Sequence, residues 1–378
     1  MTSKLPNTTT SIFSIMSKLA ADHNAINLAQ GFPGFDSDPA LIDLVNKAMK
    51  NGYNQYAPMP GDKKLRQVIS EKIESLYYKK YNADREITIT AGATQAIFTA
   101  IAATIHKDDE VIVFTPAYDC YKPSIELFGG KVVEIQLEAP TYKPNWKQVV
   151  EQVTTKTKMI LVNTPHNPTG TLLSEDDMLQ LQKISEENDL LVLSDEVYEH
   201  IIFDGKDHQS AAKFPQLAKR TFITASFGKT FHNTGWKMGY CLAPEYLMKE
   251  FQKVHQYNVF SVNHPIQKAL ATYLQDSETY LSLPQFYQKK RDYFLDLIKD
   301  SRFKFTPSKG TYFQLLDFSE ISEERDVDFA DRLTREHKIA TIPTSVFNQN
   351  QEDYKQIRVC FAKTEKELKE AAEILNSI

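Results

Sequence analysis

The sequence predicts an α/β fold with a mostly parallel sheet, together with a second, smaller α+β domain. The first reason is that seven short, often β-branched runs alternate with helical patterns between residues 86 and 245, as in a parallel sheet covered by helices. The second is a change of composition from residue 303 onward, where strand-like segments flank a helix and a terminal helix follows. The third is length, because 378 residues are enough for two unequal domains.

The predicted elements follow in chain order. The seven expected strands of the sheet are 87–90, 111–114, 132–135, 159–162, 190–193, 222–225 and 240–243. Helical periodicity then predicts helices over 244–257, 265–274 and 279–299. The C-terminal part is expected to contain two strands, 311–318 and 357–361, and two helices, 326–337 and 364–376. We therefore expect a large domain over residues 45–278 and a small domain formed by residues 1–44 and 279–378.

The composition excludes several classes of protein. With 44 basic and 49 acidic residues the net charge is −5, so no general positive field is available for nucleic acid. The longest apolar-leaning run, 96–105, is stopped by charged residues, well short of the ~20 residues that cross a bilayer. The polar N-terminus lacks the apolar stretch of a secretory signal. We expect a cytoplasmic protein without nucleic-acid or membrane partners.

The cysteines point to the same compartment. Cys120, Cys241 and Cys360 are scattered, odd in number and without the spacing of a metal site. Buried thiols in a reducing compartment explain them best, so neither a disulfide framework nor a metal centre is expected.

The residues that follow the predicted strands are the most informative, because ligands of open α/β sheets bind at strand ends. Small residues at 91–95, after the first strand, would let backbone N–H groups and a helix N-terminus approach a phosphate. An ordinary tight turn is the simpler explanation of that segment alone. Tyr118, after the next strand, could stack on a planar cofactor or belong to the core.

Polar side chains follow three further strands. Asn167 lies in a loop with two prolines and a glycine, which suits an asparagine held for hydrogen bonding, although a simple turn is an equal explanation. Asp195 is either a helix N-cap or the partner of a buried cation. Lys229, preceded by Gly228 in an apolar neighbourhood, could be desolvated enough to act as an amine nucleophile, whereas a surface lysine is the common alternative.

Taken together, these residues are the parts that a pyridoxal-phosphate site needs. A lysine binds the cofactor covalently, and a carboxylate keeps its pyridine nitrogen protonated. Asn and Tyr side chains can hydrogen-bond the ring oxygen, while Ser226, Lys237 and backbone N–H groups can neutralise the phosphate. Arg358, near the C-terminus, offers a planar fork for an α-carboxylate.

The chain resembles the fold-type I, class I aminotransferases over nearly its whole length. The segments that carry the resemblance are 31–33, 53–56 with 60–61, 91–94, 167–170, 194–198, 226–229 and 357–359. Each is modestly specific, but seven in the right order are very specific. Within the class, three further segments look most like the bacterial methionine aminotransferases, relatives of kynurenine and glutamine aminotransferases: 164–168, 226–231 with 234–237, and 253–257 with 260–263.

The resemblance implies that the cofactor is pyridoxal 5'-phosphate and assigns its ligands. Lys229 matches the lysine that binds it covalently and then moves the substrate proton, and Asp195 matches the partner of the pyridine nitrogen. Asn167 and Tyr198 match the pair bonded to the ring oxygen, so Lys229, Asp195 and Tyr198 are the expected catalytic residues. Tyr118 matches the aromatic side chain stacked on the ring. The matches to the phosphate ligands are Ala93, Thr94, Ser226 and Lys237.

The resemblance also implies a homodimer with shared active sites, because Tyr56 matches a tyrosine that reaches the phosphate in the partner subunit. Arg358 matches the ligand of the substrate α-carboxylate, with the backbone of Gly31 and the side chain of Asn167 beside it.

One departure bears on the substrate. In the aspartate-specific members an arginine from the partner subunit binds the side-chain carboxylate, but the corresponding stretch here, 256–263, contains no arginine. Phe260 lies within that stretch, and the resemblance places Ile12 and Phe13 over the substrate side chain. Burying an unpaired carboxylate beside such groups is costly, so we expect an uncharged donor.

The expected activity is therefore transfer of the amino group of methionine, and also of aromatic amino acids or glutamine, to a 2-oxo acid in a ping-pong cycle. A carbon–sulfur β-lyase is the alternative within the fold, since it uses the same lysine and aspartate. A non-enzymatic regulator built on this fold is the alternative of another class. Such regulators carry an added DNA-binding domain, for which the segment before Gly31 is too short.

Overall fold

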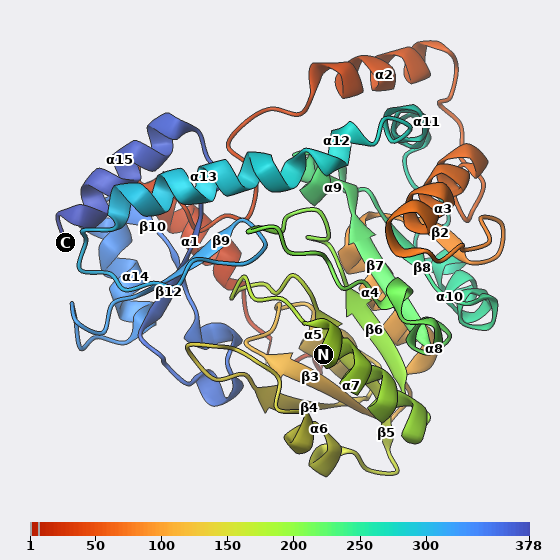
Figure 1. Cartoon of the computed structure of the whole chain (residues 1–378), viewed down its shortest axis with the longest axis horizontal. Helices are drawn as coiled ribbons and strands as arrows, with labels where there is room; N and C mark the ends of the chain where they lie inside the picture. The colour runs from red at the N-terminus through yellow and green to blue at the C-terminus, as the bar shows by residue number, and fades with distance from the viewer. Residues whose placement is uncertain (1, 7) are drawn as a thin grey trace.

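The computed structural model describes residues 2–6 and 8–378 and is built around one seven-stranded sheet (Figure 1). The strand order is β2-β8-β7-β6-β5-β3-β4, and β8 alone runs antiparallel to its neighbours. The strands are β2 (Ile87–Thr90), β3 (Glu110–Thr115), β4 (Lys131–Gln136), β5 (Thr157–Asn163), β6 (Leu191–Asp195), β7 (Thr221–Ser226) and β8 (Gly239–Leu242). All seven predicted strands of the mostly parallel sheet are confirmed.

The sequences of these strands are largely continuous apolar runs, because packed side chains cover both faces of the sheet. Within β3, Val111 and Val113 pack on one side, with α4 and α10, while Ile112 and Phe114 pack on the other. This alternation follows from the two-residue period of a strand. The helices are α1 (Ile12–Asp22), α2 (Pro39–Lys50), α3 (Lys63–Tyr77), α4 (Gly92–Thr104), α5 (Tyr121–Leu127), α6 (Trp146–Gln152), α7 (Glu175–Glu187), α8 (Pro215–Ala218), α9 (Phe227–Thr230), α10 (Glu245–Asn258), α11 (His264–Tyr273), α12 (Glu278–Leu281), α13 (Leu283–Ile298), α14 (Asp326–Arg335) and α15 (Glu365–Asn376).

The predicted single helix over 279–299 is wrong in one respect, because the structure divides it into α12 and α13 at Ser282. Pro284 lies in the first turn of α13. A proline lacks the N–H that a continuous helix would need and clashes with the preceding turn, so the helix restarts there instead.

The C-terminal part forms its own small sheet, with the order β11-β12-β9 and antiparallel pairing: β9 (Phe313–Asp317), β11 (Ile342–Pro343) and β12 (Gln356–Cys360). The helices α14 and α15 lie in the same region of the molecule (Figure 1). The N-terminal segment joins this part, because β1 (Ile26–Asn27) pairs in parallel with β10 (Ile339–Ala340) and α1 packs against α14.

The domain boundaries stay a prediction. Residues 1 and 7 of the segment 1–44 lie outside the described residues. The boundary after residue 44 falls inside α2, which packs against α11.

Three features of the described chain bear on its chemistry. Cys241 and Cys360 are buried, whereas Cys120 is half-buried, so the expectation of three buried thiols is wrong for Cys120; none of the three is in a disulfide. Among the described residues, no helix combines the length and apolarity needed to cross a membrane. Over the same residues, no group of three or more His, Cys, Asp or Glu side chains could hold a metal ion.

Candidate active site

A cavity of about 290 Å³ lies at the carboxyl ends of the parallel strands β3, β5, β6 and β7. Parallel strands end at the same edge of a sheet, so the side chains that follow them converge there. Twelve of the predicted site residues line this cavity: Phe13, Gly31, Ala93, Thr94, Tyr118, Asn167, Asp195, Tyr198, Ser226, Lys229, Lys237 and Arg358. They come from segments as distant in the chain as α1 and β12.

Lys229 lies in the short helix α9, directly after β7. Ser226 is the N-cap of this helix, and its Oγ accepts a hydrogen bond from the backbone N–H of Lys229 at 3.4 Å. The side-chain Nζ donates to the backbone oxygen of Gly31 at 2.9 Å. Burial lowers the pKa of this amine to about 8. A neutral amine is therefore accessible near physiological pH, as a nucleophile or a base requires.

Asp195 ends β6 and is 3% exposed. Burial raises the pKa of its carboxyl to about 6, against the effect of two hydrogen bonds that favour the ionised form. The Tyr121 hydroxyl donates to Oδ2 at 2.5 Å, and the backbone N–H of Val197 donates to Oδ1 at 3.3 Å. The carboxylate is thus held in one orientation beside the cavity.

Arg358 lies in β12 and is 1% exposed. Its Nη1 donates to Asn167 Oδ1 at 2.8 Å and its Nη2 to the backbone oxygen of Ala29 at 3.0 Å. The guanidinium also packs against the rings of Phe313 and Phe13, with centroids at 3.8 and 5.2 Å. No carboxylate pairs with it by an ion pair among the described residues, and its buried Nε has no hydrogen-bond partner there. A buried cation of this kind is suited to an anionic ligand.

A second candidate site for an anion lies at the N-terminus of α4, which has no side-chain cap. Gly92 begins this helix at a φ of +75°, and its Cα faces the Lys237 side chain so closely that a Cβ would lie 3.5 Å from Lys237 Cδ. The first N–H groups of the helix, at Ala93 and Thr94, line the cavity together with Ser226. Free helix N–H groups, a hydroxyl and a lysine at one end of a cavity fit a phosphate group.

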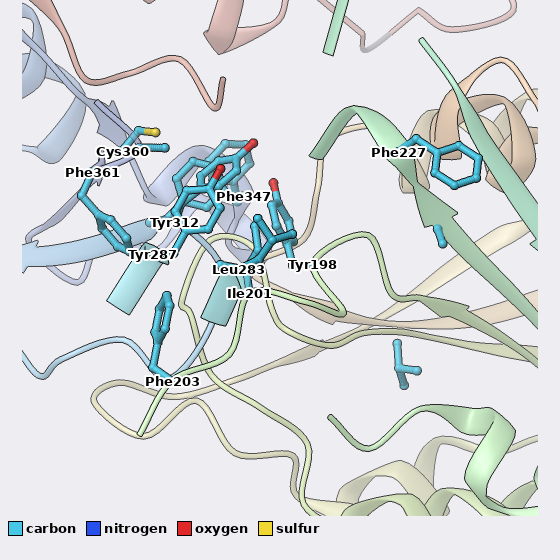
Figure 2. Packing of buried hydrophobic residues seen from close by; sticks show 14 of the residues in the cluster. Tyr198, Ile201, Phe203, Phe227, Leu283, Tyr287, Tyr312, Phe347, Cys360 and Phe361 are labelled. Atoms are coloured by element: carbon cyan, nitrogen blue, oxygen red, sulfur yellow. The ribbon is translucent and has the colours of Figure 1, made fainter. Parts of the chain in front are cut away.

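Aromatic rings form the walls around Lys229. Tyr198 stands edge-on to Tyr312, with ring centroids 5.3 Å apart, and Tyr312 packs on Tyr287 at 5.7 Å; Figure 2 shows the three side chains close together. The Tyr312 hydroxyl donates to the same Gly31 oxygen that accepts from Lys229, at 2.6 Å. Tyr118 faces the cavity beside Phe13, with centroids 6.4 Å apart.

Three predicted site residues do not line the cavity of this chain. Ile12 is half-buried against the core beside it. Tyr56 is 81% exposed and Phe260 is 43% exposed, and their rings meet edge-to-face at 5.4 Å on the surface. Their proposed roles toward the ligand therefore stay predictions.

Sequence reasoning missed several residues that shape the cavity. Asn163, the last residue of β5, donates to the Asp195 backbone oxygen at 2.9 Å and accepts from the Asn167 N–H at 2.8 Å. Its position at a strand end was a usable signal. Tyr121 and Phe313 had none, because only the folded chain brings them to Asp195 and Arg358. Gln30 precedes the predicted Gly31 in the chain and also lines the cavity.

Comparisons with known proteins agree with this geometry. A family model described as aminotransferase class I and II matches residues 23–375. The chain is 46% identical to a methionine aminotransferase of Escherichia coli (strain K12) over 100% of this chain and 98% of that protein. It is 34% identical to kynurenine–oxoglutarate transaminase 3 of Homo sapiens, over 95% of this chain and 86% of that protein.

Solved structures lead to the same family. The crystal structure of an Escherichia coli protein with a reported methionine aminotransferase function covers 100% of this chain and 99% of its own, with a TM-score of 0.98 and 46% identity. The strand-end lysine and aspartate, the buried arginine and these matches over the whole chain have one common explanation: the chain belongs to the class I and II aminotransferases.

Proposed function

We propose that this aminotransferase uses pyridoxal 5'-phosphate to move the amino group of methionine to a 2-oxo acid. The observation that carries the cofactor assignment is the arrangement of the cavity. One cavity of about 290 Å³ is lined by the Lys229 amine, whose pKa is lowered to about 8, and by the buried Asp195 carboxylate. It is also lined by the residues expected to bind a phosphate: Ala93, Thr94, Ser226 and Lys237. These groups match the aldehyde, the pyridine nitrogen and the phosphate of that cofactor.

The residues divide the work as follows. When bound, pyridoxal phosphate supplies a ring that accepts the electron pair left on the substrate Cα after its proton leaves. Asp195 would hold the protonated ring nitrogen, and Ser226, Lys237 and the N-terminus of α4 would hold the phosphate. Lys229 Nζ, in its neutral form, would accept the proton from the substrate Cα as a general base and then act as the proton donor. Arg358 orients the α-carboxylate so that the Cα proton faces Lys229.

The preference for an uncharged donor rests on the lining of the cavity. Arg358 is the only arginine among the residues that line the cavity, and the apolar lining residues include Phe13, Ile97 and Phe313. Burial of a methionine side chain gains roughly 1.5–3 kcal/mol, whereas an unpaired side-chain carboxylate costs several kcal/mol. The relative that is 46% identical is a methionine aminotransferase, which supports the same donor.

The experiment is a panel of twenty amino acids with one 2-oxo acid, recording kcat/KM for each. We expect methionine first, then phenylalanine, tyrosine or glutamine, and aspartate lower by about two orders of magnitude, at 1.4 kcal/mol per factor of ten. Equal values for aspartate and methionine would refute the pocket assignment. Release of pyruvate, ammonia and a thiol from an S-alkylcysteine, which carries its sulfur on Cβ, in place of amino-group exchange would instead indicate the carbon–sulfur β-lyase.

We also propose that the protein is a homodimer with shared sites. Tyr56 and Phe260 support this, because both aromatic rings are exposed next to each other and away from the cavity of their own chain. Mixing the inactive variants Lys229→Ala and Tyr56→Phe tests it. A mixed dimer has one site with both lesions and one intact site if Tyr56 acts across the interface, so activity should return. No recovery after demonstrated subunit exchange would refute sharing.

We propose the cytoplasm as the compartment, on the strength of three cysteines that form no disulfide. Fractionation of the source cells with an antibody to the protein tests this, and recovery of the protein in any other fraction would refute it.

A further inference from the structure

Tyr121 contacts two cavity-lining groups without lining the cavity itself. It begins α5, is 2% exposed, and donates its hydroxyl proton to Asp195 Oδ2 at 2.5 Å. Its ring stands edge-on to the ring of Tyr118, with centroids 5.7 Å apart and planes 77° apart. One buried side chain therefore touches both the carboxylate and the aromatic wall that the proposed cofactor would meet.

The local backbone explains how Tyr121 reaches both groups. The chain leaves β3 at Thr115 and turns into α5, with the Tyr121 N–H donating to the Tyr118 oxygen at 3.2 Å. This turn places Tyr118 and Tyr121 on the same side of the segment. Asp195, at the end of β6, is two strands away in the sheet order β6-β5-β3, so the hydroxyl bridges the ends of strands that are not neighbours.

We propose that Tyr121 is a positioning residue that holds the Asp195 carboxylate in its ionised form and in a single orientation toward the ring nitrogen. The inference rests on the proposed pyridoxal-phosphate function. Tyr121 itself does not touch the ligand. It acts through Asp195, whose second oxygen is already held by the Val197 N–H.

Electrostatics support this role. Burial raises the pKa of Asp195, and the hydrogen bond from Tyr121 is the largest effect that lowers it. Burial and the neighbouring Asp195 charge raise the pKa of Tyr121 well above its ordinary value, so the hydroxyl keeps its proton to donate. The other titratable groups facing Asp195 are Tyr118, Cys120, Glu196, Tyr198 and Lys229.

The test is Tyr121→Phe in the holoenzyme, because it removes the hydroxyl and keeps the ring against Tyr118. We expect kcat with methionine to fall by roughly tenfold, or about 1.4 kcal/mol, while KM changes less than about threefold. The pH midpoint of the cofactor absorption band should also shift. In the Asp195→Asn background, adding Tyr121→Phe should move that midpoint no further, as expected when two residues act as one unit.

Tyr77→Phe is the matched control. Tyr77 is also buried and donates to a buried carboxylate, Glu199 Oε2 at 2.9 Å, but it does not line or adjoin the cavity. It should leave kcat and the absorption midpoint within about twofold of wild type. An unshifted midpoint and kcat in Tyr121→Phe, or equal changes in Tyr77→Phe, would overturn the inference. A wild-type protein with no cofactor band would overturn the proposed function itself, and the inference with it.

Discussion

Two buried charged regions of this molecule shift the pKa of a carboxyl group in opposite directions. One is the cavity with Lys229 and Asp195. The other is the Glu199 cluster, made of Lys72, Tyr77, Glu199 and Tyr240. In the cluster Glu199 accepts from Lys72 Nζ at 2.6 Å and from both tyrosine hydroxyls at 2.9 and 3.0 Å. Burial by itself would raise the pKa of Glu199, but Lys72, together with His200 and His208, holds the pKa well below its ordinary value.

The cavity lacks such pairing. The Lys229 amine has a backbone oxygen as its hydrogen-bond partner where Lys72 has a carboxylate. The pKa of Lys229 is therefore lowered by burial, and that of Asp195 is raised by burial. Glu199 lies only four residues after Asp195, so burial alone does not separate the two regions. The comparison indicates that buried charged groups without an oppositely charged partner are the candidates for chemistry. Buried charged groups that form ion pairs instead stabilise the fold.

The largest expected effect is at Lys229. Lys229→Ala should lower the turnover of methionine by at least about 10⁴-fold, because it removes the buried amine after β7 that is proposed to bind the cofactor and move the proton. Steady-state kinetics measure it, and circular dichroism should show an unchanged fold. Borohydride reduction of the wild-type holoenzyme should link the cofactor to Lys229, and a labelled peptide containing Lys237 instead would contradict the assignment.

The Glu199 cluster should respond in stability. Lys72→Met should lower the free energy of unfolding by about 3–5 kcal/mol, because it leaves a buried carboxylate without its cation. The double variant Lys72→Met/Glu199→Gln should recover part of that loss. Chemical denaturation measures both. If kcat of the folded Lys72→Met protein fell more than about tenfold, the separation between a structural cluster and a reactive cavity would be wrong.

Two buried arginines offer a matched comparison. Arg358→Gln should lower kcat/KM for methionine by about 100-fold, since it removes the fork that faces the α-carboxylate. Arg291 is instead paired with Asp204, at 2.7 and 3.0 Å. Arg291→Gln should lower stability and leave kcat/KM within about threefold. Equal losses of kcat/KM in the two variants, from the same kinetic assay, would remove Arg358 from the substrate site.

The smallest expected effect is a change in the pH dependence of the reaction between Lys229 and the cofactor. A protonated amine is not nucleophilic, and burial lowers the pKa of Lys229 to about 8. The rate at which cofactor-free protein reacts with pyridoxal 5'-phosphate should therefore rise with pH and level off above pH about 8, whereas an ordinary lysine continues to gain reactivity up to a pKa of about 10.4. Stopped-flow absorbance follows the reaction. The same profile in Lys229→Ala would show that another amine was observed.

Much of the fold could be predicted from the sequence, because its signals are local. Short β-branched runs separated by helical patterns placed all seven strands of the large sheet. The expectation failed where a single residue decided the outcome, as at Pro284, where a proline restarts a helix that periodicity treats as continuous. The candidate site followed partly from the same signals, since Tyr118, Asn167, Asp195 and Lys229 each lie at the end of a strand or within four residues after it.

The sequence by itself determined which side chains end the strands, and their order along the chain. Only the tertiary structure decided how these groups are paired. Lys229 meets the backbone of Gly31, 198 residues away, and Arg358 meets Asn167, 191 residues away. Whether a buried charge finds a partner depends on contacts of this length, which no local pattern encodes. For this reason Tyr121 could be identified as the hydrogen-bond partner of Asp195 only from the folded chain.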